Sequence, residues 1–120
     1  LLEPSEANYE GARKIINKLI KDGIVFDGVF ATNDWRAYGV MMGLAENNIN
    51  VPDEVKVIGF DDIFISHSCH PSMSTIRQDV AGLAYKAASL LMDLIDNKEI
   101  QVDQRRFILP VEVISRDSTK

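Results

Sequence analysis

Short apolar runs alternate with amphipathic helical segments along this chain, and this alternation is the feature that most limits its fold. Residues 28–32 (GVFAT) and 55–60 (VKVIGF) resemble buried strands, whereas residues 5–21 and 34–47 carry apolar side chains at helical spacing. Strands and helices that alternate in this way favour a parallel sheet covered by helices. We therefore expect an α/β fold, with an open, mostly parallel sheet and flanking helices.

The ends of these segments carry recognisable signals. Ser5 is expected to cap the first helix and Asn33 or Asp34 the second, because their side-chain oxygens can accept hydrogen bonds from free backbone N–H groups. Gly23 is expected to end the first helix, and a third helix is expected to start at Asp79. Residues 61–74 look irregular, and short strands are expected at 74–77, 106–109 and 111–114.

Composition describes one globular domain and excludes several functions. The chain has 120 residues, 46% of them apolar, and a net charge of −5. An acidic chain without a basic stripe is a poor ligand for nucleic acid, and no apolar run reaches the roughly 20 residues that span a bilayer. A single cysteine, Cys69, mildly favours a reducing, cytoplasmic setting. The opening LLEPSE, without Met, indicates a fragment of a longer protein.

Polar side chains follow two of the expected strands at the point where each ends. Asn33 and Asp34 follow the first, and Asp61 and Asp62 follow the second. In open α/β sheets ligands bind beyond the carboxyl ends of the strands. Asn33 offers a donor and an acceptor, and an ionised Asp61 only accepts, which suits a hydroxyl-rich molecule such as a sugar. The competing interpretation is that Asn33 or Asp34 only caps the helix and Asp62 only starts a turn.

Four blocks follow one another along residues 28–116: ATNDWRAYGV, INVPDEVKVIGFDD, PSMSTIRQ and ILPVEVISRDST. Together they resemble the C-terminal part of the LacI/GalR family of bacterial transcription regulators. The resemblance implies one lobe of a two-lobed domain built like a periplasmic sugar-binding protein. It also implies that the helix-turn-helix, which alone would contact operator DNA, and most of the first lobe lie outside residues 1–120.

The resemblance implies a set of ligand-binding residues. The sugar-contacting amide of the family matches Asn33 and its sugar-contacting carboxylate matches Asp61, while Asp34 and Gln78 complete the expected set. Many members stack an aromatic ring on the ligand at a place that falls near Leu2, and leucine cannot stack in that way. We expect Asp61 to reach the ligand and Asp62 to stay nearer solvent and hold the turn.

The second helix carries apolar residues on two faces, although a surface helix needs only one. Trp35, Tyr38 and Met42 lie on the second face. The family forms dimers through this helix and through a loop that matches residues 64–70, so the expected interface also includes Phe64, Ser68, Cys69 and His70. Two alternatives remain open: the same chain covers these rings, or Trp35 lines the mouth of the ligand cleft.

The third helix raises a related question. In the family, the segment matching residues 78–101 packs on the first lobe. Without that lobe its apolar stripe (Val80, Leu83, Ala87, Leu91 and Leu94) would lose its partner. We expect the helix either to exchange with a second copy or to dock irregularly.

Other motifs predict little. His67, Cys69 and His70 lack the second pair of ligands that a zinc site requires, and no catalytic signature occurs, so we expect neither a metal, a cofactor nor an enzyme. A phosphate-accepting receiver domain would need its acidic pair after the first strand. The expected function is effector binding and dimerisation in a sugar-responsive repressor; the alternative is a lobe of a periplasmic sugar-binding transport protein.

Overall fold

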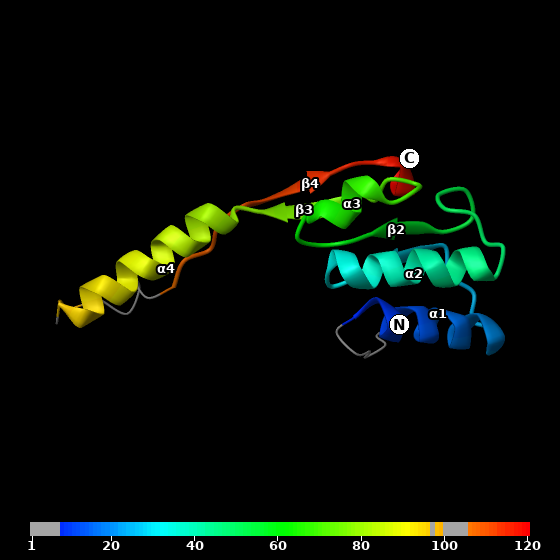
Figure 1. Ribbon diagram of the computed structural model, residues 1–120, viewed down its shortest axis with the longest axis horizontal. Coiled ribbons are helices and arrows are strands. Elements are labelled where there is room, and N and C mark those ends of the chain that lie inside the picture. The colour runs from blue at the N-terminus through cyan, green and yellow to red at the C-terminus, as the bar shows by residue number, and fades with distance from the viewer. Residues whose placement is uncertain (1–7, 97, 100–105) are drawn as a thin grey trace. The chain divides into compact units, whose positions relative to one another are not determined.

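The structure, a computed structural model, describes residues 8–96, 98–99 and 106–120 (Figure 1). The chain divides into two compact units, residues 1–77 with 113–120 and residues 78–112. The elements in chain order are α1 (Tyr9–Lys21), β1 (Gly28–Phe30), α2 (Asp34–Glu46), β2 (Lys56–Ile58), α3 (Phe64–Ser68), β3 (Thr75–Gln78), α4 (Val80–Ile95), β4 (Val111–Ile114) and the 3-10 helix η2 (Asp117–Thr119).

The strands form small sheets with helices beside them, so the expected α/β class is confirmed in this coarser form. β1 and β2 pair in parallel, with Val29 opposite Val57. An isolated parallel bridge joins Ile58 to Ser74, just before β3, and β3 and β4 form a second two-stranded sheet. The strands are short: β1 and β2 have three residues each, and β3 and β4 have four each.

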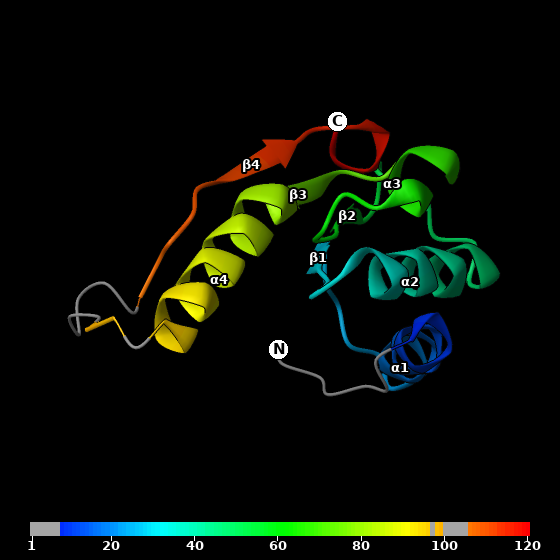
Figure 2. The same cartoon turned by 60° about the vertical axis from the view of Figure 1, so that its left-hand side comes forward.

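Helices α1 and α2 lie side by side (Figures 1 and 2). They approach closely at Gly39, where an added Cβ would lie 2.7 Å from the carbonyl carbon of Tyr9. Ser5, which was expected to cap the first helix, lies outside the described residues. The N-cap of α1 is Asn8, whose side chain accepts from the backbone N–H of Gly11 at 2.8 Å. The predicted end is confirmed: α1 stops at Lys21, and Gly23 adopts a positive φ of 72°.

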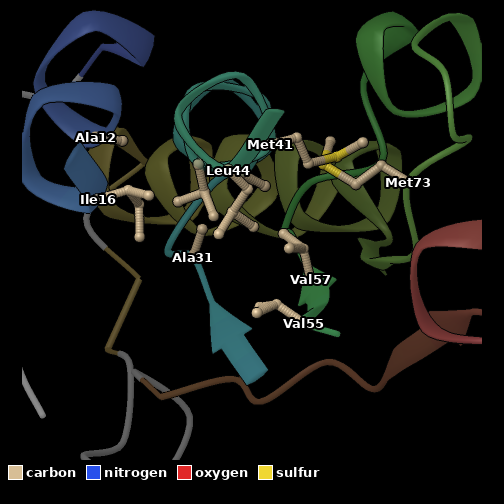
Figure 3. Packing of buried hydrophobic residues seen from close by; sticks show 10 residues of the cluster. Ala12, Ile16, Ala31, Met41, Leu44, Val55, Val57 and Met73 are labelled. Atoms are coloured by element: carbon tan, nitrogen blue, oxygen red, sulfur yellow. The ribbon is translucent and has the colours of Figure 1, made fainter. Parts of the chain in front are cut away.

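The hydrophobic core lies between these helices and the parallel strands. Figure 3 shows the side chains of Ile16, Leu44 and Val57, which come from α1, α2 and β2. Leu44 and Val57 are fully buried. Burying a side chain of this size contributes roughly 1.5–3 kcal/mol, so this cluster fixes the strands whose ends carry the candidate site.

The C-terminal residues complete the first unit. The hydroxyl of Ser118 donates to the carbonyl of Val57 at 2.6 Å and accepts from the backbone N–H of Ser74 at 2.8 Å. Ser118 is fully buried. Its hydroxyl satisfies one polar group of β2 and one polar group of the segment just before β3.

Helix α4 begins as expected, with the Asp79 side chain accepting from the N–H of Gly82 at 2.9 Å. None of its residues is buried. Its exposed apolar side chains include Val80, Leu83, Leu91, Leu94 and Ile95.

Two expectations about the elements are wrong. Residues 61–74 are not wholly irregular, since they include α3, and residues 106–109 form no strand, since β4 begins at Val111.

Among the described residues, no helix combines the length and apolarity needed to cross a membrane.

Candidate functional site at the strand ends

The two polar strand ends are neighbours. Beyond the paired residues of β1 and β2, the N–H of Ala31 donates to the carbonyl of Ile58 and the N–H of Asp34 donates to the carbonyl of Phe60, both at 2.9 Å. The prediction that the strands before Asn33 and Asp61 are parallel neighbours is therefore confirmed. That both side chains bind a ligand stays a prediction.

Asn33 caps helix α2. Its side-chain oxygen accepts from the backbone N–H of Arg36 at 2.8 Å, as the capping interpretation expected. This bond occupies the amide oxygen in a structural role. The NH2 end of the same amide is the donor that a sugar oxygen would require.

Asp34 is fully buried and serves the chain itself. Its Oδ1 accepts from the hydroxyl of Thr75 at 2.6 Å, and its Oδ2 accepts from the backbone N–H of Ile63 at 2.8 Å. Burial raises the pKa of Asp34 above its ordinary value, while these two hydrogen bonds work against the rise and the nearby charges of Asp61 and Asp62 add to it. The structure thus gives Asp34 a structural task, and its contact with a ligand stays a prediction.

The turn at Asp61 and Asp62 has an unusual backbone. Both residues have positive φ, 106° for Asp61 and 54° for Asp62. Non-glycine residues in such regions cost roughly 1–3 kcal/mol each and persist only where their surroundings impose them. The N–H of Asp61 donates to the carbonyl of Ile76 at 2.8 Å, and the N–H of Asp62 donates to the Thr75 hydroxyl at 3.3 Å. Contacts to the segment of β3 therefore help to impose this turn.

Asp62 is enclosed, and the expectation that it stays near solvent is wrong. Its side chain is 9% exposed. Arg116 Nη2 lies 2.7 Å from one carboxylate oxygen, and Arg77 Nε lies 2.7 Å from the other. Burial alone raises the pKa of Asp62, but hydrogen bonds from Arg116, Arg77 and Ser66 outweigh it, so the pKa lies below its ordinary value. The carboxylate is drawn inward because two guanidinium groups neutralise it there.

Arg116 is the residue of this cluster whose role the sequence did not reveal. Its Nη1 donates to the carbonyl of Met73 at 2.9 Å and to the hydroxyl of Ser66 at 3.1 Å. The ion pair with Asp62 spans 54 positions of the chain. The sequence signal is an arginine two residues after the expected strand 111–114, which does not identify its partner.

Two further expected ligand residues lie elsewhere. Gln78 ends β3, is half-buried, and belongs to the second unit. Leu2 lies outside the described residues. Their roles stay predictions.

The expected dimer surface is partly covered by the chain's own residues. The ring of Tyr9 lies 6.5 Å from that of Trp35 and 6.4 Å from that of Tyr38, measured between centroids. Trp35 nevertheless remains 48% exposed, and Tyr38 and Met42 are half-buried. Dimerisation through this surface stays a prediction.

The second part of the expected interface is α3 and the residues after it. Phe64, on α3, is 75% exposed, and its ring meets that of His67 edge-on with 5.2 Å between centroids. Ser68 and His70 are exposed, whereas Cys69 is half-buried and burial raises the pKa of its thiol. Over the part of the chain that the structure describes, no three His, Cys, Asp or Glu side chains gather to hold a metal ion.

A cavity of about 330 Å³ lies in the first unit between α1 and β1. Its lining is mainly apolar, with Ile15, Leu19, Phe26 and Phe30 among the residues, and contains neither Asn33 nor Asp61. Thr32 and Arg36, which lie close to Asn33 in the chain, also line this cavity, although the two candidate ligand residues do not.

Comparisons with known proteins identify the family. The model of the periplasmic binding protein-like domain matches residues 2–119. The transcriptional regulator GalR of Escherichia coli (strain K12) is 36% identical over 98 residues, which cover 82% of this chain and 28% of GalR. The ribose operon repressor of Bacillus subtilis (strain 168) is 30% identical over 120 residues, all of this chain and 36% of that repressor.

Solved structures agree with this assignment. A LacI family transcriptional regulator from Arthrobacter sp. FB24, in complex with lactose, superposes with a TM-score of 0.84 at 28% identity, covering 97% of this chain and 44% of that one. A LacI family regulator from Enterococcus faecium with bound ribose gives 0.77 at 30% identity, covering 97% and 42%. These relatives are transcriptional regulators rather than enzymes. The chain therefore belongs to the periplasmic binding protein-like domain family, as part of the effector domain of a LacI/GalR-family transcriptional regulator.

Proposed function

We propose that this chain supplies one half of a sugar-binding site and a dimer surface to a cytoplasmic repressor of the LacI/GalR family. The effector would bridge two lobes and change their relative arrangement. That change would alter the affinity for operator DNA, which a separate N-terminal domain would contact. Binding shifts the equilibrium only in so far as the effector binds the two arrangements with different affinities.

The observation that carries the proposal is the shared edge formed by the ends of β1 and β2. Asn33 and Asp61 each follow the last residues of one of these parallel neighbours. An amide donor and a carboxylate acceptor at one edge match a hydroxyl group, which donates one hydrogen bond and accepts others. The relatives with bound lactose and bound ribose support a sugar as the ligand class.

Asp61→Asn tests the acceptor. A hydrogen bond to a charged group contributes about 1.5–3 kcal/mol, so we expect roughly tenfold to 150-fold weaker sugar binding. Isothermal titration of the full-length protein with galactose, lactose and ribose measures the affinity. The control is Asp53→Asn, which makes the same change at an exposed turn residue. Unchanged sugar affinity in Asp61→Asn would remove this residue from the site.

Asn33→Asp tests the donor without removing the helix cap. Aspartate also accepts from the N–H of residue 36, so helix α2 should keep its stability. The NH2 donor is lost, and a charge is added near Asp34. We therefore expect weaker sugar binding with an unchanged melting temperature, measured by titration and by thermal unfolding. A sugar affinity equal to that of the unsubstituted protein would show that the amide of Asn33 serves only as a cap.

Trp35→Ala tests the dimer surface. Truncating a central aromatic residue at an interface commonly costs 2 kcal/mol or more, so we expect the dimer dissociation constant to rise about 30-fold. Sedimentation equilibrium of the full-length protein measures it. Val25→Ala is the control, because Val25 is 96% exposed and lies outside the expected interface. Equal dissociation constants for the two variants would exclude Trp35 from the interface.

A further inference from the structure

We propose that Arg77 and Arg116 are positioning residues for the effector site: they hold Asp62 between them and so fix the adjacent Asp61 in the orientation that meets the sugar. This inference rests on the proposed function, because it explains how the same site is kept in place. In this arrangement Asp62 positions Asp61 and does not itself contact the ligand.

Each oxygen of the Asp62 carboxylate has its own arginine. Oδ1 lies 2.7 Å from Arg116 Nη2, and Oδ2 lies 2.7 Å from Arg77 Nε. The hydroxyl of Ser66 also donates to Oδ1, at 3.1 Å. Rotation of the carboxylate would break an ion pair on one side or the other, so the side chain has one favoured orientation.

The backbone passes this orientation on to Asp61. One peptide group joins the two residues, and both have positive φ. The N–H of Asp61 is bound to the carbonyl of Ile76 at 2.8 Å, so the residue is held on one side by β3 and on the other by Asp62. A strained turn held at both ends directs the Asp61 side chain more narrowly than a relaxed loop would.

The two arginines differ in how deeply they are set. The Arg116 side chain is 17% exposed and also donates to Met73 and Ser66, so its removal would disturb several buried acceptors. The Arg77 side chain is 50% exposed. Substitution of Arg77 should therefore remove one ion pair from Asp62 without unfolding the chain. This makes Arg77 the better residue for testing the positioning role.

The test measures sugar affinity and melting temperature together in the full-length protein. We expect Arg77→Met to weaken sugar binding about fivefold or more, the lower end of typical coupling between sites, with the melting temperature little changed. Arg77→Lys, which keeps a cation near Asp62, should recover part of the lost affinity. Arg116→Met should weaken binding further and also lower the melting temperature.

Arg13→Met provides the matched control. Arg13 makes an ion pair with Glu46 at 2.7 Å, and its side chain is 35% exposed, but it joins α1 to α2 away from the turn. It should leave sugar affinity unchanged. If Arg77→Met binds sugar like the unsubstituted protein while Asp61→Asn does not, the positioning role is overturned and the site stands. If the unsubstituted protein binds none of the sugars, the proposed function itself fails.

Discussion

At the scale of single residues, two enclosed carboxylates sit close together with pKa values shifted in opposite directions. Asp34 is fully buried, its carboxylate accepts from two neutral groups, the Thr75 hydroxyl and the Ile63 N–H, and its pKa is raised by burial. Asp62 has two arginines, and its pKa is lowered in spite of burial. The presence of a charged partner, and not burial alone, therefore decides whether the fold favours the protonated or the ionised carboxyl group.

The raised pKa of Asp34 predicts that its contribution to stability weakens as pH rises. A raised value in the folded state means that this contribution is fully present below the unfolded pKa and is lost as pH rises through the folded pKa. Asp34→Asn cannot ionise and should remove this component. We therefore expect the free energy of unfolding of the variant, minus that of the original chain, to increase from acid to neutral pH. Urea unfolding of the 120-residue chain, followed by fluorescence of its single tryptophan, Trp35, measures this.

Asp62 should behave in the opposite way. A lowered pKa means that its contribution is present above the unfolded value and is lost as pH falls through the folded value. Asp62→Asn keeps the shape and tolerates positive φ but removes the charge between Arg77 and Arg116. We expect a loss of about 2 kcal/mol at neutral pH, between the values for exposed and enclosed ion pairs. The same urea experiment at pH 7 and pH 3 should show this difference shrinking in acid; a constant difference would contradict it.

At the scale of elements, the contact between α1 and α2 depends on small residues. An added Cβ at Gly39 would collide with the backbone of Tyr9, and one at Gly43 would lie 3.1 Å from the carbonyl oxygen of Arg13. Backbone cannot move aside as a flexible side chain can. The two helices therefore tolerate little enlargement at their crossing.

Gly39→Ala should destabilise the chain although alanine favours helices. The helix preference is worth about 1 kcal/mol in favour of alanine. Overpacking against fixed backbone costs about 1–3 kcal/mol and sometimes more, so a net loss is expected. Gly43→Ala is the matched control and should cost less. Thermal unfolding of both variants checks the order, and a more stable Gly39→Ala would show that the helices can separate freely.

The elements that the sequence predicted are those with local signals. β1, α2 and the start of α4 follow from apolar spacing and from caps at Asn33 and Asp79. Helix α3 was missed because it has five residues and its N-cap, Ile63, makes no side-chain capping bond.

The site was predictable to the same extent. The neighbouring strand ends followed from the α/β pattern. The enclosure of Asp62 by Arg77 and Arg116 did not, because partners 15 and 54 positions away depend on the completed fold rather than on local sequence.

At the scale of the whole molecule, the second unit contains a helix with no buried residue. Leu91 and Leu94 of α4 are 58% and 54% exposed. An apolar face of this kind favours association. The structure therefore leaves the expected exchange or irregular docking of this helix as a prediction about the 120-residue chain.

Leu91→Glu combined with Leu94→Glu tests that prediction. Because both side chains are exposed, the first unit should keep its melting temperature. We expect the unsubstituted chain to associate as its concentration rises and the double variant to stay monomeric, measured by light scattering. Lys86→Glu, also exposed on α4, is the control for added charge. A monomeric unsubstituted chain with an ordered α4 would refute the prediction.

The buried hydroxyl of Ser118 has a practical consequence for anyone who handles this domain. Removal of the last three residues would delete Ser118, and the carbonyl of Val57 in β2 would lose the hydrogen bond that Ser118 donates to it. A reporter protein or purification tag should therefore be attached after Lys120, or inserted near Val25, which is 96% exposed. Insertion just before the buried Ser118 should be avoided.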